Sequence, residues 1–247
     1  MVRHGLILAA GLGTRLRPLT LERAKPAMTV GGVPIIRRVI TWLAREGVTE
    51  IVVNLHHLPE TITSIVGDGS DMGARVRYSW EQPAVLGSAG GPRHALPIIG
   101  ASTFFIVNGD TLTDLPLRGL AEAHAATSAL VTMALTPNRE PDKYGGARMA
   151  DDGQISGFVG RGPQAAGSYH FIGVQVASAE VFADLTDGEP INSTHGVYDA
   201  LIASRAGSVR GYLCEAAFWD IGTPEDLART DAHFHRLKAD AADNVNA

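Results

Sequence analysis

The sequence predicts an α/β protein, a three-layer α/β/α sandwich around a mixed but mainly parallel central sheet. In its first half, short apolar runs alternate with amphipathic segments, which is the rhythm of successive βαβ units. The chain has 247 residues, of which 45% are hydrophobic and 19% charged, so it can bury one full core. No stretch reaches the ~18 consecutive apolar residues of a membrane-spanning helix, so we expect no membrane partner.

Local patterns place the elements of the first half. Apolar or alternating runs predict strands over residues 6–10, 50–54, 75–80 and 104–107. A helix is expected over residues 34–46, because Ile35, Val39 and Leu43 share one apolar face. A shorter helix is expected over residues 59–66. Ligands of such sheets gather at the carboxyl ends of the strands, where the loops of interest lie.

From about residue 137 the pattern changes. The turn Asp151-Asp152-Gly153 predicts a hairpin. Strands are expected over residues 171–176 and 209–213, helices over residues 193–203 and 223–237, and a frayed tail over residues 240–247. No linker, internal repeat or low-complexity tract divides the chain, so a single domain over residues 1–247 is expected.

The segment LAAGLGTRLRPLT, residues 8–20, joins the first strand to a glycine-rich turn and then to cationic residues. Gly11 and Gly13 are expected to adopt φ > 0 and to bring backbone N–H groups close to an anion. Arg15, Arg17 and Lys25 add positive charge at the same place, although Arg17 could instead face solvent, and the proline after Lys25 favours an extended backbone there. These features predict a polyphosphate site.

Other phosphate-binding motifs fit less well. A dinucleotide fingerprint needs a third glycine where Leu16 stands, and no P-loop sequence occurs in the chain. The net charge of −5 argues against a nucleic-acid surface. Cys214 is the single cysteine, which excludes an intrachain disulfide and suits a reducing cytoplasm.

Residues 8–35 also carry a resemblance to a known family. LAAGLGTRLRPLT and KPAMTVGGVPII resemble the signature LAAGxGTRLxPLT…KPxxxxxGxPxI of the sugar-1-phosphate nucleotidylyltransferases. The resemblance implies a nucleotide-binding half over residues 1–136, a sugar-binding half over residues 137–222, and a C-terminal helix and tail over residues 223–247. It implies transfer of a nucleotidyl group from a nucleoside triphosphate to a sugar 1-phosphate, with release of pyrophosphate.

The resemblance also implies a catalytic and metal centre. Asp110 closes FFIVNGD and Asp220 lies in FWDIGTPEDL, and in the family these aspartates hold Mg²⁺ against the triphosphate. A turn or a helix cap is the alternative role for each carboxylate. Arg15, Lys25 and Asp110 are the implied catalytic residues. The implied nucleotide-binding set is Leu8, Ala10, Gly11, Gly13, Thr14, Arg15, Gln82, Gly87, Ser88, Asn108 and Gly109.

Two further segments would select the base and the sugar. EQPAVLGSAGG, residues 81–91, resembles the family's base-recognition loop, in which Gly87 admits the base edge and Gln82 or Ser88 bonds to it. A flexible loop, or a helix cap at Ser88, is the alternative. In the sugar half the resemblance implies contacts from Tyr144, Gly145, Arg161 and Gly173.

The sugar half departs from the family pattern. FxEKP is replaced by FVGRGP, so Arg161 stands near the usual lysine and the glutamate is absent. The closing FWDIGTPEDL resembles mannose- and heptose-1-phosphate guanylyltransferases, which favours GTP with a sugar of that type. The missing FxEKP resembles the short N-acetylmuramate-1-phosphate uridylyltransferases, which favours UTP with that sugar or a hexose 1-phosphate.

Other readings of the chain stay open at this point. A catalytically silent nucleotide-sugar sensor is one alternative, and a transferase that acts on a non-sugar phosphate is another. Assembly into a homodimer is also left open by the sequence.

Overall fold

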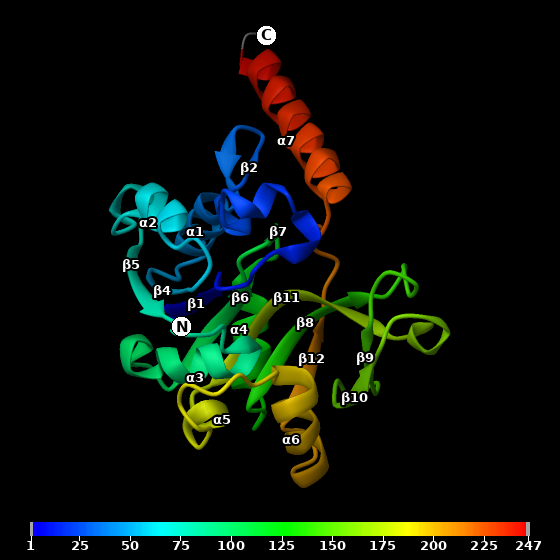
Figure 1. Cartoon of the computed structure of the whole chain (residues 1–247). Helices are drawn as coiled ribbons and strands as arrows, with labels where there is room; N and C mark the ends of the chain where they lie inside the picture. Colours follow the sequence, from blue (N-terminus) through cyan, green and yellow to red (C-terminus); the bar gives the residue numbers. More distant parts are fainter. Residues whose placement is uncertain (1, 246–247) are drawn as a thin grey trace.

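The computed structural model describes residues 2–245 and has a nine-stranded sheet at its centre, with helices on both sides (Figure 1). Four adjacent parallel strands come from the first half of the chain, in the spatial order β6 (Thr103–Asn108), β1 (His4–Leu8), β4 (Glu50–Leu55) and β5 (Arg75–Trp80). The chain runs outward from β1 to β5 and then returns to the other side of β1 at β6. Ligands of open α/β sheets bind at such a reversal of strand order.

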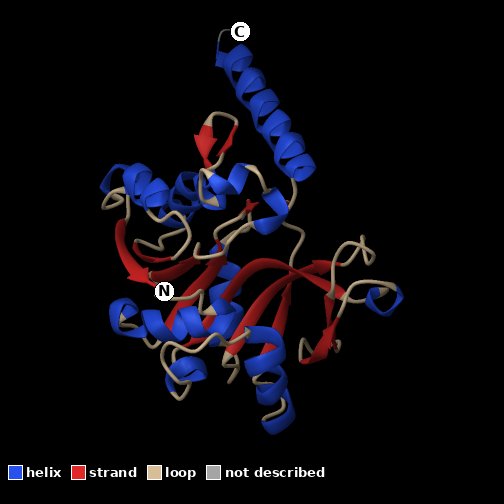
Figure 2. Ribbon diagram, in the orientation of Figure 1, coloured by secondary structure: helices blue, strands red, loops and turns tan. Residues whose placement is uncertain are grey.

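Strands of the second half extend the sheet beyond β6. β11 (Tyr169–Ser178) is antiparallel to β6 and also pairs with β8 (Val131–Pro137) and β9 (Gly146–Met149). β10 (Ile155–Val159) forms the predicted hairpin with β9, and β12 (Val209–Leu213) lies parallel to β8. The sheet is therefore mixed, and it runs without a break through both halves of the chain (Figure 2).

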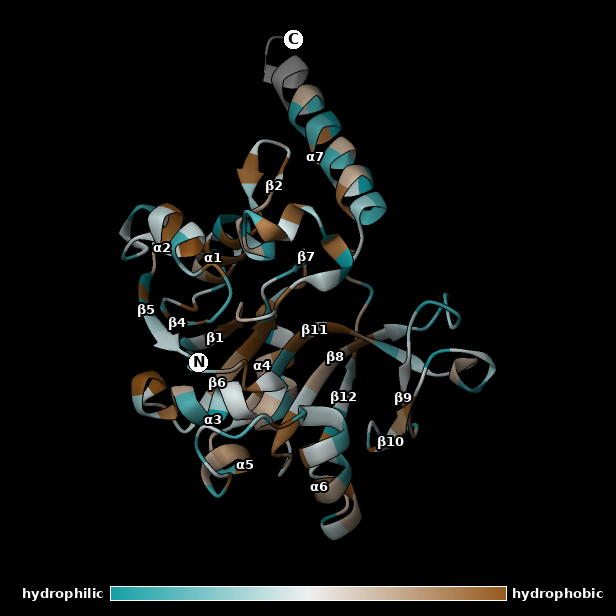
Figure 3. Cartoon of the chain, in the orientation of Figure 1, coloured by the Kyte–Doolittle hydropathy of each residue, from teal (hydrophilic) through white to brown (hydrophobic). Residues whose placement is uncertain are grey.

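Helices cover both faces of the sheet and complete the three predicted layers. One face is covered by α1 (Ile35–Arg45), α2 (Glu60–Val66) and α4 (Leu117–Ala125). The other face is covered by α3 (Gly87–Ile99), α5 (Glu180–Ala183) and α6 (Asp199–Ser204). Neighbouring residues of β1 enter different cores, Leu6 on the α3 side and Ile7 on the α1 side, because strand side chains alternate. Figure 3 shows the resulting brown, hydrophobic sheet between the helical layers.

The C-terminal helix α7 (Pro224–Val245) projects from the body of the molecule (Figure 1). A small hairpin of β2 (Thr29–Val30) and β3 (Val33–Pro34) supports its first half. There the Gly31 amide donates to Asp231 Oδ1 at 2.9 Å, and the Arg38 guanidinium lies 4.5 Å from the Phe234 ring centroid. None of the helices within residues 2–245 is both long and apolar enough to cross a bilayer.

Two expectations about these elements are wrong. Residues 87–91 are not part of a loop but the first turns of α3, a helix concealed in the sequence by its glycines and by Pro92 and Pro97. α7 continues to Val245 instead of fraying from residue 240, and residues 246–247 lie outside the described residues. The helix expected over residues 193–203 is present, and its first part, Ser193–Tyr198, is a wider π-helical segment that leads into α6.

Candidate active site

The carboxyl ends of β1 and β6 open onto a small hollow. Residues 9–14, here called the glycine loop, follow β1, and Asp110 follows β6. The Gly109 amide donates to the Leu8 carbonyl oxygen at 2.9 Å, and a Cβ at position 109 would lie 2.7 Å from that oxygen, so the two strand ends meet only because residue 109 is glycine. The hollow has a volume of about 200 Å³, and its lining is Leu8, Ala9, Gly11, Gly13, Thr14, Arg15, Lys25, Pro26, Asp110 and Gly222.

The two glycines of the glycine loop play different parts. Gly13 has φ +59°, and a Cβ there would lie 2.8 Å from the Thr20 methyl carbon. Gly11 does not adopt positive φ, contrary to the expectation; a Cβ at this exposed residue would meet no atom within 4 Å. Gly13 is thus required by the backbone turn, whereas Gly11 leaves open space beside the hollow.

Two of the three predicted cations, Arg15 and Lys25, line the hollow, whereas Arg17 does not. Lys25 is only 7% exposed, and its Nζ lies 2.5 Å from Asp110 Oδ2. Lys25 begins a 3₁₀ turn, Lys25–Ala27, although the proline after it favours an extended backbone. Arg15 is exposed, and its guanidinium lies against Gly222, where a Cβ would be 2.9 Å from Nη1. Cationic residues of the N-terminal motif therefore lie close to Asp110 and form one charged cluster with it.

The structure brings Asp220 to the same cluster through a short pair of strands. In β13 (Phe218–Asp220), Asp220 lies opposite Thr111 of β7 (Thr111–Thr113), and the Ile221 amide donates to the Asp110 carbonyl oxygen at 3.2 Å. Burial raises the pKa of the Asp220 carboxyl, Asp110 raises it further, and Lys25 and Arg15 lower it. Asp110 and Asp220 are far apart in the sequence, but they lie close enough for the charge of Asp110 to raise the pKa of Asp220.

This donor set fits Mg²⁺. Mg²⁺ is commonly bound by one or two protein carboxylates together with substrate phosphates and water. The carboxylates of Asp110 and Asp220 repel each other, as the raised pKa of Asp220 shows, and a divalent cation removes that repulsion. Within residues 2–245 no group of three or more histidine, cysteine or acidic side chains is placed to hold a metal, so the remaining ligands would come from substrate and water.

The structure agrees only in part with what was expected of residues 81–91, the segment predicted to bind the base. Gln82 is exposed and carries no internal partner in the part of the chain that the structure describes, so its amide is available to a ligand. A Cβ at Gly87 would lie 2.7 Å from the Ile191 carbonyl oxygen, which explains this glycine by packing. Ser88 does not cap α3; its Oγ accepts from the Ser193 amide at 2.8 Å and bonds to the Ser193 hydroxyl at 2.9 Å. Both features join α3 to the segment before α6.

The expected sugar-binding residues only partly converge. The Tyr144 ring lies 4.1 Å from the His170 ring and 6.4 Å from the Phe218 ring, and these three aromatics line a second hollow of about 610 Å³. Burial raises the pKa of Tyr144, and Asp220 raises it further, which places this ring near the acid pair. Gly173, with φ +80°, lies against Asn108 and Thr111 beside Asp110.

Gly145 and Arg161 lie farther out on the β9–β10 hairpin side. A Cβ at Gly145 would be 2.6 Å from the Val159 carbonyl oxygen, so this glycine is required by the hairpin. Arg161 is exposed, lines neither hollow, and has no side-chain hydrogen bond or ion pair within residues 2–245. The structure therefore does not place Arg161 with the other expected sugar-phosphate ligands.

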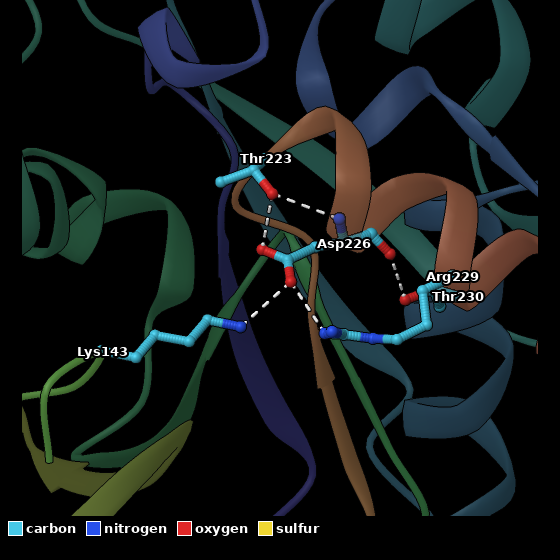
Figure 4. Close-up of polar contacts among 5 residues, drawn as sticks. All are labelled: Lys143, Thr223, Asp226, Arg229 and Thr230. Carbon is cyan, nitrogen blue, oxygen red and sulfur yellow. Dashed lines mark hydrogen bonds and ion pairs between the residues drawn. The ribbon is translucent and has the colours of Figure 1, made fainter. Parts of the chain in front are cut away.

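An ion-pair network that the sequence did not reveal joins the sugar half to α7 (Figure 4). The Asp226 carboxylate, with its side chain 5% exposed, accepts from Lys143 Nζ at 3.0 Å, from Arg229 at 2.7 Å and from the Thr223 hydroxyl at 3.0 Å. Lys143 also lies 5.0 Å from the Tyr144 ring centroid. The only sequence signal is the lysine immediately before Tyr144. This network ties Lys143, the neighbour of Tyr144, to the start of α7.

Comparisons with known proteins agree with this architecture. A nucleotidyl transferase family model matches residues 4–236. N-acetylmuramate alpha-1-phosphate uridylyltransferase of Neisseria meningitidis is 34% identical over 223 residues, which are 88% of this chain and 92% of that protein. Mannose-1-phosphate guanylyltransferase of Mycobacterium tuberculosis is 28% identical over 232 residues, which are 94% of this chain.

The chain spans 64% of the length of the Mycobacterium protein. Among solved structures, HddC from Yersinia pseudotuberculosis has a TM-score of 0.81 at 24% identity, with 94% of this chain and 100% of that chain covered. At that identity the likeness shows the fold, a mixed α/β sandwich.

Proposed function

The chain belongs to the nucleotidyl transferase family, and from this premise we propose that it is a sugar-1-phosphate nucleotidylyltransferase. The observation that supports the proposal is the convergence of the glycine loop, Lys25 and Asp110 on one hollow at the reversal of strand order, with Asp220 close beside Asp110. A volume of about 200 Å³ suits the phosphates of a nucleotide but is below the usual size of a site for a whole nucleotide-sized ligand, so the base lies outside it.

In the proposed reaction a phosphate oxygen of the sugar 1-phosphate attacks the α-phosphorus of the nucleoside triphosphate. The bond from the α-phosphorus to the bridging oxygen breaks, and pyrophosphate leaves with the electron pair. Such transfers are catalysed mainly by positioning and by stabilisation of charge. No residue needs to form a covalent intermediate.

The chain's own residues would divide this work. Lys25 and Arg15 would bind the phosphates and stabilise the charge that develops on the leaving pyrophosphate. Asp110 and Asp220 would hold Mg²⁺. The cation held there would supply positive charge that offsets part of the charge of the nucleotide phosphates. The remaining members of the proposed nucleotide site are Leu8, Ala10, Gly11, Gly13, Thr14, Gln82, Gly87, Ser88, Asn108 and Gly109.

For the acceptor we propose a site beside Tyr144 and Gly173. The aromatic rings of Tyr144 and Phe218 offer apolar faces to a sugar, and Tyr144 lies near Asp220. Arg161 and Gly145 stay candidate ligands only if the β9–β10 hairpin moves toward the hollow.

The base and the sugar are proposed from the relatives. GTP with a mannose- or heptose-type 1-phosphate is our first candidate, because FWDIGTPEDL resembles such enzymes and the Mycobacterium relative is named a mannose-1-phosphate guanylyltransferase. UTP with N-acetylmuramate 1-phosphate is the second candidate. It is favoured by the Neisseria relative, because this chain matches 92% of the length of that protein.

A matrix assay tests the proposal. A panel of nucleoside triphosphates is combined with a set of sugar 1-phosphates and non-sugar phosphates in the presence of Mg²⁺, and release of pyrophosphate is measured. We expect turnover with one base and one class of sugar 1-phosphate. Binding without turnover in every combination would indicate a sensor, and turnover only with a non-sugar phosphate would replace the proposed acceptor.

A further inference from the structure

A buried chain of hydrogen bonds connects the glycine loop to the segment of residues 81–86. The Ala9 amide donates to Asn54 Oδ1 at 2.6 Å, Asn54 Nδ2 donates to Glu81 Oε1 at 2.6 Å, and the Leu86 amide donates to Glu81 Oε2 at 2.7 Å. Glu81 is 0% exposed, and Asn54, Ala9 and Leu86 are each 2% exposed. Polar groups buried to this degree must find their partners within the chain.

The chemistry of the four groups fixes the direction of every bond. The two ends, Ala9 and Leu86, are backbone N–H groups that only donate. Asn54 offers one acceptor and one donor group, and it therefore accepts from Ala9 and donates onward. The group between Asn54 and Leu86 must then accept on both sides, which an ionised carboxylate does and an amide does not. The Glu81 carboxylate meets this requirement, because each of its two oxygens accepts one of the bonds.

The space around this hydrogen-bonded chain, here called the relay, is equally specific. A Cβ at Gly91 would lie 2.6 Å from Glu81 Oε1 and 2.8 Å from Asn54 Nδ2, so the first turns of α3 admit the pair only because residue 91 is glycine. The Glu81 amide and carbonyl are also held, by the Leu55 carbonyl oxygen at 2.8 Å and by His56 Nδ1 at 2.8 Å. The backbone of Glu81 is therefore held in place as well as its side chain.

We propose that Asn54 and Glu81 are positioning residues that hold the glycine loop and the 81–86 segment in register, so that the phosphates and the base of one nucleotide are bound together. The inference rests on the proposed function, because it takes the bound molecule to be a nucleoside triphosphate. Ala9 lines the phosphate hollow, and Gln82 directly follows Glu81. A shift at either end of the relay therefore moves one nucleotide contact relative to the other.

Three variants test the relay. Glu81→Gln turns an amide N–H₂ toward a donor, and Asn54→Asp sets a carboxylate against a carboxylate, so each single change breaks one link. The double variant Asn54→Asp/Glu81→Gln restores every link. In it the new carboxylate at position 54 accepts from the Ala9 amide and from the new side-chain amide at position 81, whose oxygen accepts from the Leu86 amide. The double variant also keeps the number of buried carboxylates unchanged.

Thr132→Val is the matched control. It removes a buried hydrogen bond of 2.9 Å between the Thr132 hydroxyl and His124, and neither residue lines either hollow. The control therefore separates loss of a buried bond in general from loss of the relay.

Two measurements are made on the full chain. Amide hydrogen exchange at Ala9 and Leu86 reports the relay without any ligand, and the dissociation constant for the triphosphate selected in the matrix assay reports its effect on binding. We expect each single variant to lose protection at one or both amides and to weaken triphosphate binding by roughly tenfold or more, and the double variant to recover both. The control is expected to leave both unchanged.

Outcomes separate the relay from the proposed function. Single variants that lose amide protection but keep wild-type affinity would reduce the relay to a structural role and overturn the positioning claim. A double variant no better than the singles would overturn the assigned bond directions. Failure of the wild-type chain to bind any triphosphate, with the exchange pattern intact, would refute the proposed function and with it the positioning role.

Discussion

Replacement of Lys25 by methionine tests the electrostatic core of the proposed site. The change removes the positive charge and keeps an unbranched side chain in a position that is 7% exposed, so water does not take the place of the ammonium group. Loss of one preorganised donor from such a site costs about 3–4 kcal/mol of transition-state stabilisation, or roughly 10²–10³ in kcat. The Asp110 side chain is 32% exposed and remains partly solvated after the change, which places the expected effect near the lower end, about 100-fold.

The assay is steady-state release of pyrophosphate with both substrates saturating. Arg17→Met is the matched control, because Arg17 is exposed and does not line the hollow. Circular dichroism and a thermal melt establish that both variants are folded. A Lys25→Met variant that turns over within about threefold of wild type, or an equal loss in Arg17→Met, would refute the assignment of Lys25 as the charge-stabilising residue.

Three other predictions rest on the same geometry. Asp110→Asn and Asp220→Asn are each expected to abolish turnover and the Mg²⁺ dependence of triphosphate binding while the thermal melt stays within a few degrees of wild type; normal rates would remove the metal assignment. Asp226→Asn is expected to lower the free energy of unfolding by ~1–2 kcal/mol, because Asp226 is buried but Lys143 and Arg229 can still reach water, and calorimetry should show a melt lower by roughly 2–6 °C. Burial lowers the pKa of His170 to about 4, so between pH ~6.5 and about 4 only the unfolded chain takes up this proton. The free energy of unfolding should then fall by roughly 2 kcal/mol from about pH 7 to about pH 5, and denaturant titrations of His170→Gln should lack that part of the dependence.

The sequence alone predicts several of the residues that line the first hollow, because each has a local signal. Gly13, Lys25 and Asp110 each follow directly from a strand or turn signal, and the chemistry of each residue type is legible without contacts. Their convergence depends on β1 and β6 being neighbours, which the βαβ rhythm does not specify, because β4 and β5 come between them in the sequence. Gly11 shows the limit of this reasoning. A positive φ was expected there because the residue is glycine, but within the glycine loop only Gly13 adopts that conformation.

Contacts made by pairing between distant segments could not be predicted in this way. Asp220 reaches Asp110 through the β7–β13 pair, two strands of three residues each, which are too short to give an alternating pattern. Asn54 was expected only as the end of a strand, although its amide joins two loops. The helical start at Gly87 was hidden because glycine and proline argue against a helix, whereas packing against Ile191 decides the conformation there.

The acid pair lies between two parts of the chain whose side chains are held in different ways. Asp110 belongs to the parallel half and Asp220 to the segment that precedes α7, so the centre sits on the joint between the halves. On one side of this joint Lys25, Asn54 and Glu81 are buried, and hydrogen bonds join Asn54 to Ala9 and to Glu81. On the other side Tyr144 is held mainly by stacked rings and by Lys143, and Arg161 stands on an exposed hairpin. We therefore expect substitutions around Tyr144, in the second hollow, to change acceptor specificity without loss of nucleotide binding, because the proposed phosphate contacts lie in the first hollow.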